Sequence, residues 1–128
     1  MILVDTVVWL RALRAIEPFE SALDALLAAE LVLAHEFVYG ELLIGDPGGA
    51  RRGLLRDVAQ MTQAPLVAHA EVVKIVRRHA LYGTGLSWID AHLLASALAE
   101  DAELWTADRP LLLAAAHVGC PLFNPKDL

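Results

Sequence analysis

Apolar residues in this chain follow two patterns, short continuous runs and longer segments in which they recur every three or four positions. The continuous runs at residues 2–4 and 31–34 have the length and composition of buried strands, and residues 103–106, with Leu104 and Trp105 at their centre, predict a third. Two further short strands are expected at residues 65–67 and 121–123. Amphipathic periodicity predicts helices at residues 6–13, 18–30, 35–45, 54–61, 72–80, 88–100 and 110–117.

Strands that alternate with helices indicate an α/β fold. The strands are almost entirely apolar, which is typical of a parallel sheet covered by helices on both faces. We therefore predict a single domain over residues 1–128, with a mostly parallel central sheet of four to five strands. Sites in such sheets lie outside the carboxyl ends of the strands. Asp5 directly follows the first strand and Asp108 follows the strand at 103–106, so both are expected at that edge.

Two further acids occur within helical segments. Glu41 lies four residues after Phe37 and three before Ile44, which predicts that it lies on an apolar face. Asp90 shares a predicted face with Leu93 and its apolar neighbours. Acids are rarely fully buried unless they are paired, so acids on the core sides of two helices need a common explanation.

Each acid also has a purely structural interpretation. Asp5 could cap the helix at 6–13, and Asp108 could cap the helix that opens with Arg109 and Pro110. Asp90 could stabilise its helix dipole from the first turn, and Glu41 could reach solvent past Gly40.

Taken together, the acids favour a metal site. Carboxylates that converge at one sheet edge repel each other unless a cation neutralises them. Ligand sets made only of oxygen suit Mg²⁺ or Mn²⁺, and two such ions about 3.5–4 Å apart can activate water and stabilise the leaving oxygen of a phosphodiester.

Four sequence segments carry a family resemblance. They are ILVDTVVW, the glutamate-containing YGELLIG, LSWIDAHLLASAL and LWTADRPL, and they occur in that order across almost the whole chain. In these segments the chain resembles PIN-domain proteins, specifically the VapC toxins of bacterial and archaeal toxin–antitoxin pairs.

The resemblance implies a Mg²⁺- or Mn²⁺-dependent endoribonuclease in which a metal-activated water hydrolyses RNA. It assigns the catalytic and metal-binding roles to Asp5, Glu41, Asp90 and Asp108. Thr6 and Thr106 match the family's hydroxyl positions beside the first and last acids. We expect these hydroxyls to hydrogen-bond carboxylates or metal-bound water, with bonding at strand ends and helix caps as the alternative.

The chain departs from the family pattern at two positions. Val7 stands where many members carry Ser or Asn, and Pro110 stands where many carry a further acid. The first departure removes a polar group near the site, and the second favours one bound metal ion over a filled pair.

Composition narrows the function classes only partly. The apolar fraction of 57% suggests that part of the surface is covered by a second copy of the chain or by a partner protein. The single cysteine fits a protein of a reducing compartment. We see no secretory signal and no membrane span, and expect a cytoplasmic protein. The net charge of −6 argues against a polyanionic partner, but the few cations are grouped. Candidates for phosphate contacts, each of which could equally be a plain surface charge, are Arg11, Arg14, Arg51, Arg52 and Arg109.

Other residue types give weaker indications. The histidines lack zinc-site spacing, and His35 and His92 are interpreted as solvated or core residues despite their nearness to the acids. Trp9, Trp88 and Trp105 are most simply core, with base stacking as the alternative. No nucleotide-binding loop is present.

Two functions therefore remain in view. The first is a VapC-type endoribonuclease acting on unpaired loops of tRNA or rRNA, dimeric and inhibited by a VapB-like antitoxin. The second is a catalytically inactive PIN-like module that binds an antitoxin or itself. A phosphatase that forms an aspartyl phosphate on Asp5 is disfavoured, because Val7 occupies the place of its second acid.

Overall fold

The centre of the protein is a small parallel sheet. The structure, a computed structural model, describes residues 1–45 and 50–128, without the side chains of Ala50 and Arg51. Strand β1 (Ile2–Val4) lies between β2 (Val32–Leu33) and β3 (Glu103–Trp105). Ile2 is in register with Val32 on one side and with Glu103 on the other, and both pairings are parallel. All but one residue of the strands are buried, which explains their nearly continuous apolar sequence.

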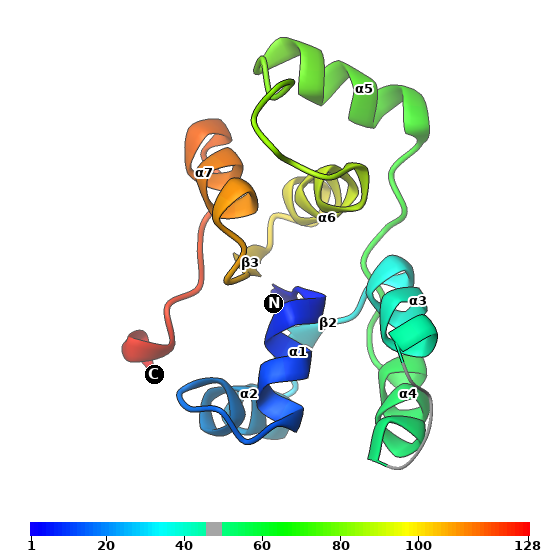
Figure 1. Ribbon diagram of the computed structural model, residues 1–128, viewed down its shortest axis with the longest axis vertical. Coiled ribbons are helices and arrows are strands. Elements are labelled where there is room, and N and C mark those ends of the chain that lie inside the picture. The colour runs from blue at the N-terminus through cyan, green and yellow to red at the C-terminus, as the bar shows by residue number, and fades with distance from the viewer. Residues whose placement is uncertain (46–49) are drawn as a thin grey trace.

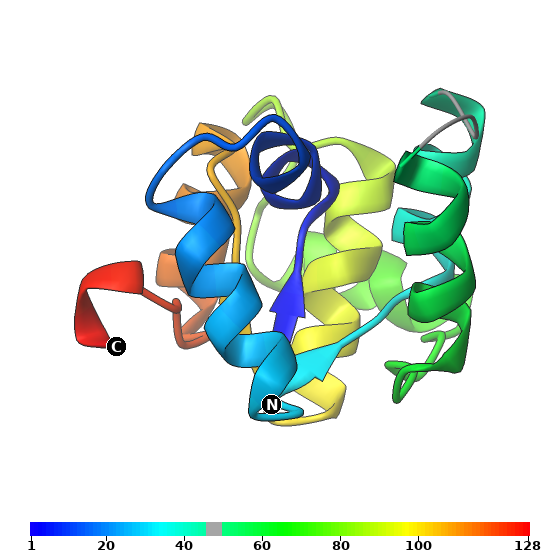
Figure 2. The same cartoon turned by 90° about the horizontal axis from the view of Figure 1, so that it is seen from below.

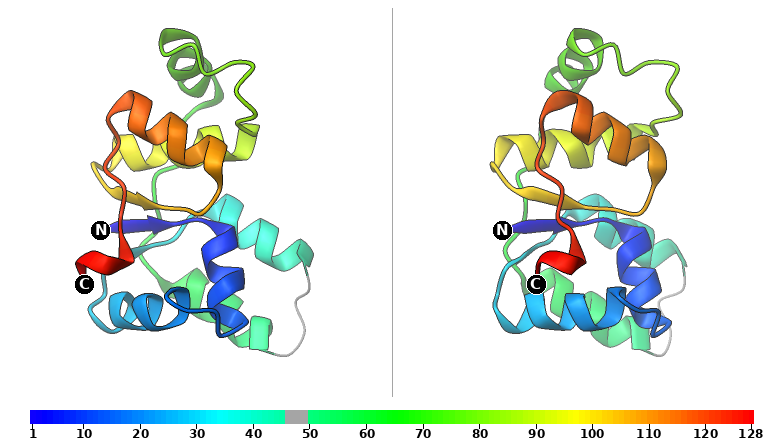
Figure 3. Two further views of the ribbon diagram at one scale, coloured as in Figure 1. Left: turned by 60° about the vertical axis from the view of Figure 1, so that its left-hand side comes forward. Right: turned by 90° about the vertical axis from the view of Figure 1, so that its left-hand side faces the viewer.

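Helices cover both faces of this sheet (Figures 1 and 3). The helices are α1 (Thr6–Leu13), α2 (Phe19–Ala28), α3 (Glu36–Gly45), α4 (Ala50–Gln60), α5 (His69–Arg78), α6 (Trp88–Ala99) and α7 (Arg109–Val118). Helices α6 and α7 cover one face with α5 outside α6, while α1 and α2 cover the other, with α3 and α4 beside α1. A short 3₁₀ helix, η1 (Pro125–Asp127), follows near the C-terminus.

The sheet is smaller than expected, while its class is as predicted. Three strands form it in the described part of the chain, instead of four to five. Leu122, in the predicted strand at 121–123, makes only a single parallel bridge to Leu104, and Gln63, just before the predicted strand at 65–67, makes another to Ala34. Residues 65–67 form no strand. Pro65 and Pro121 lack the backbone N–H that a longer ladder would need next to each bridge.

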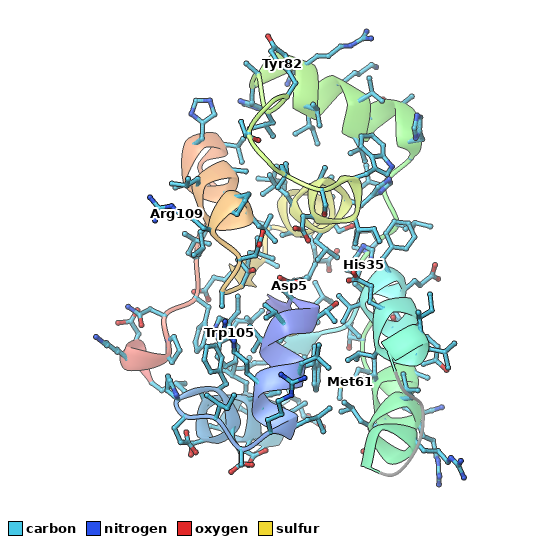
Figure 4. All side chains as sticks on the ribbon, in the orientation of Figure 1. Asp5, His35, Met61, Tyr82, Trp105 and Arg109 are labelled. Carbon is cyan, nitrogen blue, oxygen red and sulfur yellow. The ribbon has the colours of Figure 1, made fainter. Side chains whose placement is uncertain are left out.

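A buried polar network holds the segment before α5 against the core. The Ser96 hydroxyl donates to the Pro65 carbonyl at 2.7 Å, and the same oxygen lies 2.9 Å from Nε2 of His35. The other imidazole nitrogen, Nδ1, accepts the Phe37 N–H at 3.0 Å, so Nε2 carries the proton and donates to Ser96. Burial, together with the nearby His92, lowers the pKa of His35 to about 4 and keeps it neutral. His35 is therefore a core histidine between α3 and α6 (Figure 4).

Within residues 1–45 and 50–128, none of the helices combines the length and apolarity needed to cross a lipid bilayer.

Candidate active site

Three helices begin at the carboxyl edge of the sheet, the edge towards which β1 points in Figure 2. Asp5 is the N-cap of α1, Ser87 is the N-cap of α6 and Asp108 is the N-cap of α7. The parallel sheet brings α1 and α7 to this edge, because β1 and β3 each end there before the helix begins, whereas α6 arrives from the segment that follows α5. Figure 4 shows Asp5 in the centre of this region. Positive helix ends favour negative groups, which explains why acids are tolerated here.

Asp5 is buried, with 4% of its surface exposed, and both of its carboxylate oxygens accept hydrogen bonds. Oδ1 accepts the Thr6 N–H at 2.7 Å, and Oδ2 accepts the Thr106 hydroxyl at 2.7 Å. The Thr106 oxygen in turn accepts the N–H of Asp108 at 3.0 Å. One threonine hydroxyl thus connects the acid at the end of β1 with the acid at the start of α7.

Glu41 lies on the exposed side of α3, which corrects the prediction that it lies on an apolar core face. Its Oε1 accepts the Thr6 hydroxyl at 2.6 Å. Ile44, the residue expected on the same apolar face, is 87% exposed. The pattern predicted the wrong face of α3, because the residues of this helix that are buried are Val38 and Leu42, one position away from Phe37 and Glu41. Glu41 therefore reaches solvent, as its structural interpretation expected, and still lines the acidic hollow.

Asp90 lies in the first turn of α6 and is partly buried. Its backbone N–H donates to the Ser87 hydroxyl at 3.1 Å, the N-cap bond of this helix. Ser87 was missed by the sequence interpretation, although a serine three residues before an acid at the start of an apolar helix is a recognisable capping pattern.

All four predicted acids line one shallow hollow of about 250 Å³. Lysine and arginine are absent from its described lining, which consists of Asp5, Thr6, Val7, Leu10, Glu41, Ser87, Asp90 and Asp108. Helix capping engages one oxygen each of Asp5 and Asp108, so the structural and functional interpretations of these two acids are compatible.

The predicted arginines do not reach the hollow in the described residues. Arg109 points away from Asp5 on the outer side of α7 (Figure 4). Arg11 lies 5.1 Å from the centre of the Phe19 ring, in a cation–π contact. Arg14 and Arg52 are exposed, and the side chain of Arg51 lies outside the described part of the structure.

Burial and mutual repulsion disfavour the ionised forms of the acids that line the hollow. Burial, reinforced by the charge of Asp5, raises the pKa of Asp90 to about 6. Burial also raises the pKa of Asp5, against the hydrogen bonds from Thr106 and Thr6, and the charges of Glu41 and Asp108 add to the rise. A cation placed among these groups would reverse both shifts.

The donor set fits a hard divalent cation, since every candidate ligand is an oxygen. No cluster of three or more acidic, histidine or cysteine side chains is already gathered at metal-ligand spacing in the ranges 1–45 and 50–128. The acids therefore share a hollow rather than a preformed coordination shell.

Both departures from the family pattern can be located. Val7 is partly buried and lines the hollow, where it offers no hydrogen-bonding group. Pro110 lies in the first turn of α7 and against Gly85, where an added side-chain carbon would be 3.5 Å from the proline ring. The position of the family's further acid is thus occupied by an apolar contact to the turn before α6.

Comparisons with known proteins agree with this architecture. Residues 2–116 match the PIN domain family. The chain is 41% identical over 124 residues to ribonuclease VapC32 of Mycobacterium tuberculosis, covering 95% of this chain and 96% of that protein.

Solved structures show the same fold. FitAcB from Neisseria gonorrhoeae superposes with a TM-score of 0.70 at 22% identity, over the full length of both chains. PAE2754 from Pyrobaculum aerophilum gives a TM-score of 0.59 at 19% identity, over 88% of this chain and 83% of that one. From the family match and the identity to VapC32, we conclude that the chain belongs to the PIN-domain family.

Proposed function

We propose that this protein is a Mg²⁺- or Mn²⁺-dependent endoribonuclease, the toxin of a VapBC-type toxin–antitoxin pair. The observation that carries the proposal is the shared hollow lined by Asp5, Glu41, Asp90 and Asp108 at the carboxyl edge of the sheet. The relative with 41% identity over nearly the whole chain is a ribonuclease, which supports RNA as the substrate.

The four acids would hold the metal ion, whose positive charge supports water attack on a phosphodiester and offsets charge on the phosphoryl oxygens. The chain's own residues position the ligands. Thr106 fixes the Asp5 carboxylate through Oδ2, and Thr6 fixes Glu41 through Oε1. Because Pro110 replaces a further acid, we favour one ion over two.

The expected substrate is unpaired RNA in structured molecules such as tRNA or rRNA. A shallow, open hollow suits a strand whose bases are splayed out, whereas a duplex buries its base edges. Candidates for contacts to distant phosphates are the exposed Arg14, Arg52 and Arg109, together with Arg11 and Arg51.

The direct test is incubation of the purified protein with total RNA and Mg²⁺ or Mn²⁺, with and without a chelator. We expect discrete fragments that disappear when the chelator is present, because the carboxylates alone cannot neutralise phosphoryl charge. Cleavage that continues unchanged in chelator would contradict the metal mechanism.

The proposed assembly is a homodimer bound by a small VapB-like antitoxin. Two apolar residues at the end of α3, Leu43 and Ile44, are 44% and 87% exposed and lie beyond Glu41, where a partner could cover them. A basic antitoxin side chain that enters the hollow would inhibit by competing with the metal. We expect a dimer in sedimentation at micromolar concentration; a strictly monomeric profile would count against this part of the proposal.

The alternative function is a catalytically inactive module that only binds its partner. Val7, which removes a polar group from the hollow, is the residue that favours it. This alternative requires that folded, antitoxin-free protein leaves every RNA intact with either metal.

A further inference from the structure

Positive and negative side chains are separated along this chain. Residues 72–89 and 109–126 contain none of the 16 acidic residues, although the net charge of the chain is −6. The same two segments contain half of the ten lysines and arginines, namely Lys74, Arg77, Arg78, Arg109 and Lys126. A stretch of surface without acids, in a chain that has an excess of them, is typical of a surface that faces an anionic partner.

The fold brings these two segments together. The end of α5 and its connection to α6 lie against α7, with a groove of about 330 Å³ between them. The groove is lined by parts of residues 80–84 and 110–117, and its described lining contains no acidic side chain. Nε2 of His117 donates to the His79 carbonyl at 3.2 Å, which ties the last turn of α7 to the end of α5. In Figure 1 this region lies at the upper end of the long axis, where the chain leaves α5 above α7.

Three exposed arginines border the groove. Arg77 and Arg78 form the end of α5, and Arg109 begins α7, one helical turn before Leu113 of the groove. Lys74, one turn before Arg78, is paired with Glu71 at 3.1 Å, whereas the three arginines form no ion pair within the described part of the chain. We call Arg77, Arg78 and Arg109 the basic rim.

Helix dipoles explain the basic rim only in part. Arg77 and Arg78 lie in the last turn of α5, where a cation stabilises the negative end of the helix. Arg109 is the first residue of α7, where a cation meets the positive end of the helix and is unfavourable. The position of Arg109 and the lack of acids in both segments therefore need a further explanation.

The groove connects the basic rim with the acidic hollow. Pro110, which lines the groove, follows Asp108 of the hollow by two residues. Thr84 of the groove precedes Ser87 of the hollow by three residues. From Pro110 to His117 the groove follows α7 for roughly 10 Å, at about 1.5 Å per residue, a distance that a few nucleotides can span. The described lining of the hollow has no lysine or arginine, so contacts that attract phosphates have to come from outside it.

We propose that the basic rim binds backbone phosphates of the RNA on one side of the scissile bond, and so holds the substrate along the groove. This inference rests on the proposed endoribonuclease function. Phosphate contacts fix the position of a nucleic acid without reading its sequence, so the rim would contribute affinity and orientation rather than base selectivity.

The surroundings of the rim favour RNA over an anionic membrane. Helix α5 could lie on a lipid surface only if its apolar face were free. That face is occupied, because Val72 is buried and Ile75 and Val76 pack against the core. The guanidinium groups of the rim remain outside, and their planar donors match phosphate oxygens in pairs.

The test measures RNA binding without cleavage, in an Asp90→Asn background, by fluorescence anisotropy of a labelled RNA hairpin over a series of salt concentrations. We expect Arg77→Ala/Arg78→Ala to weaken binding by about 10-fold near 0.1 M salt, because two phosphate contacts are lost. The slope of log affinity against log salt should become shallower by about 1.5, at about 0.7–0.9 for each lost contact. Two hairpins of unrelated sequence should lose affinity by the same factor.

Two further variants separate phosphate binding from a structural role. Arg77→Lys/Arg78→Lys keeps both charges and should recover the salt slope and most of the affinity. Arg56→Ala is the matched control, because it removes an exposed arginine of α4 that is followed directly by Asp57. We expect Arg56→Ala to leave the slope unchanged.

Three results would overturn the role of the basic rim. The first is an unchanged salt slope in Arg77→Ala/Arg78→Ala, and the second is an equal change of slope in Arg56→Ala. The third is a double variant that binds RNA normally but loses self-association in sedimentation, which would assign the rim to a protein interface. None of these results affects chelator-sensitive cleavage by the wild-type protein, so failure of the rim is distinguishable from failure of the proposed function.

Discussion

Asp90→Asn is expected to eliminate RNA cleavage while making the protein more stable. Loss of a residue that merely supports a metal ligand typically costs about 10- to 100-fold, so loss of a ligand itself should reduce cleavage by more than about 100-fold. The amide keeps the size of the side chain and the Ser87 cap bond, which uses the backbone N–H of residue 90. The measurement is fragment formation from total RNA under saturating Mg²⁺.

The gain in stability follows from the raised pKa of Asp90. Folding raises this pKa from 3.8 to about 6, so the folded state disfavours the ionised carboxylate. The resulting penalty is absent below the unfolded pKa, grows as the pH rises between the two values and is complete above pH 6. After a discount for solvent screening at this partly exposed site, Asp90→Asn should raise the free energy of unfolding by about 1–2 kcal/mol at neutral pH.

The measurement is urea unfolding of Asp90→Asn and the wild-type protein in the presence of a chelator, at neutral pH and near pH 4. The difference in free energy of unfolding between the two proteins should nearly vanish near pH 4. Asp24→Asn, on the exposed side of α2, is the matched control, with an expected change within about 0.5 kcal/mol and normal cleavage. A variant that loses both cleavage and stability would indicate that Asp90 has a structural role instead.

The regular elements were predictable because they depend on local pattern. The apolar runs around β1, β2 and β3 and the periodicity of α6 specify buried strands and helices almost to the residue. Acids placed directly after strands also specified the sheet edge, because all parallel strands end on the same side. The predicted strand at residues 65–67 was wrong because Pro65 lacks an N–H, and its carbonyl accepts a hydrogen bond from Ser96 instead.

Exposure at the ends of elements could not be read from periodicity. Glu41 and Ile44 lie on the same predicted face as Phe37, yet they are exposed because α3 packs on the core through Val38 and Leu42 instead. Trp88 was placed in the core as a large apolar residue, but at the first residue of α6 it is 43% exposed. Both errors concern tertiary surroundings, which the local pattern does not contain.

Protons and the metal ion compete for the same carboxylates, so the Mg²⁺ concentration needed for cleavage should depend strongly on pH. Asp5 and Asp90 both have raised pKa values, the latter about 6, and both must be deprotonated to bind a cation. Below pH 6 the Mg²⁺ concentration that gives half-maximal cleavage should therefore rise by about 10-fold per pH unit if one acid is titrating, and by up to about 100-fold if both are. Saturating Mg²⁺ should restore the rate, because the metal displaces the protons.

Thr106 provides the sharpest control for this competition. Its hydroxyl donates to Oδ2 of Asp5 at 2.7 Å and stabilises the ionised form, so Thr106→Val should raise the Asp5 pKa further. The half-saturation profile should then shift to higher pH, whereas Thr106→Ser, which keeps the donor, should follow the wild-type profile. If the Mg²⁺ requirement does not change between about pH 5 and 8, the protons on Asp5 and Asp90 are not competing with the metal, and the ligands must be sought elsewhere. A shift in Thr106→Val alone would show that the hydrogen bond at the end of β1, and not the fold as a whole, sets the affinity of the hollow for its ion.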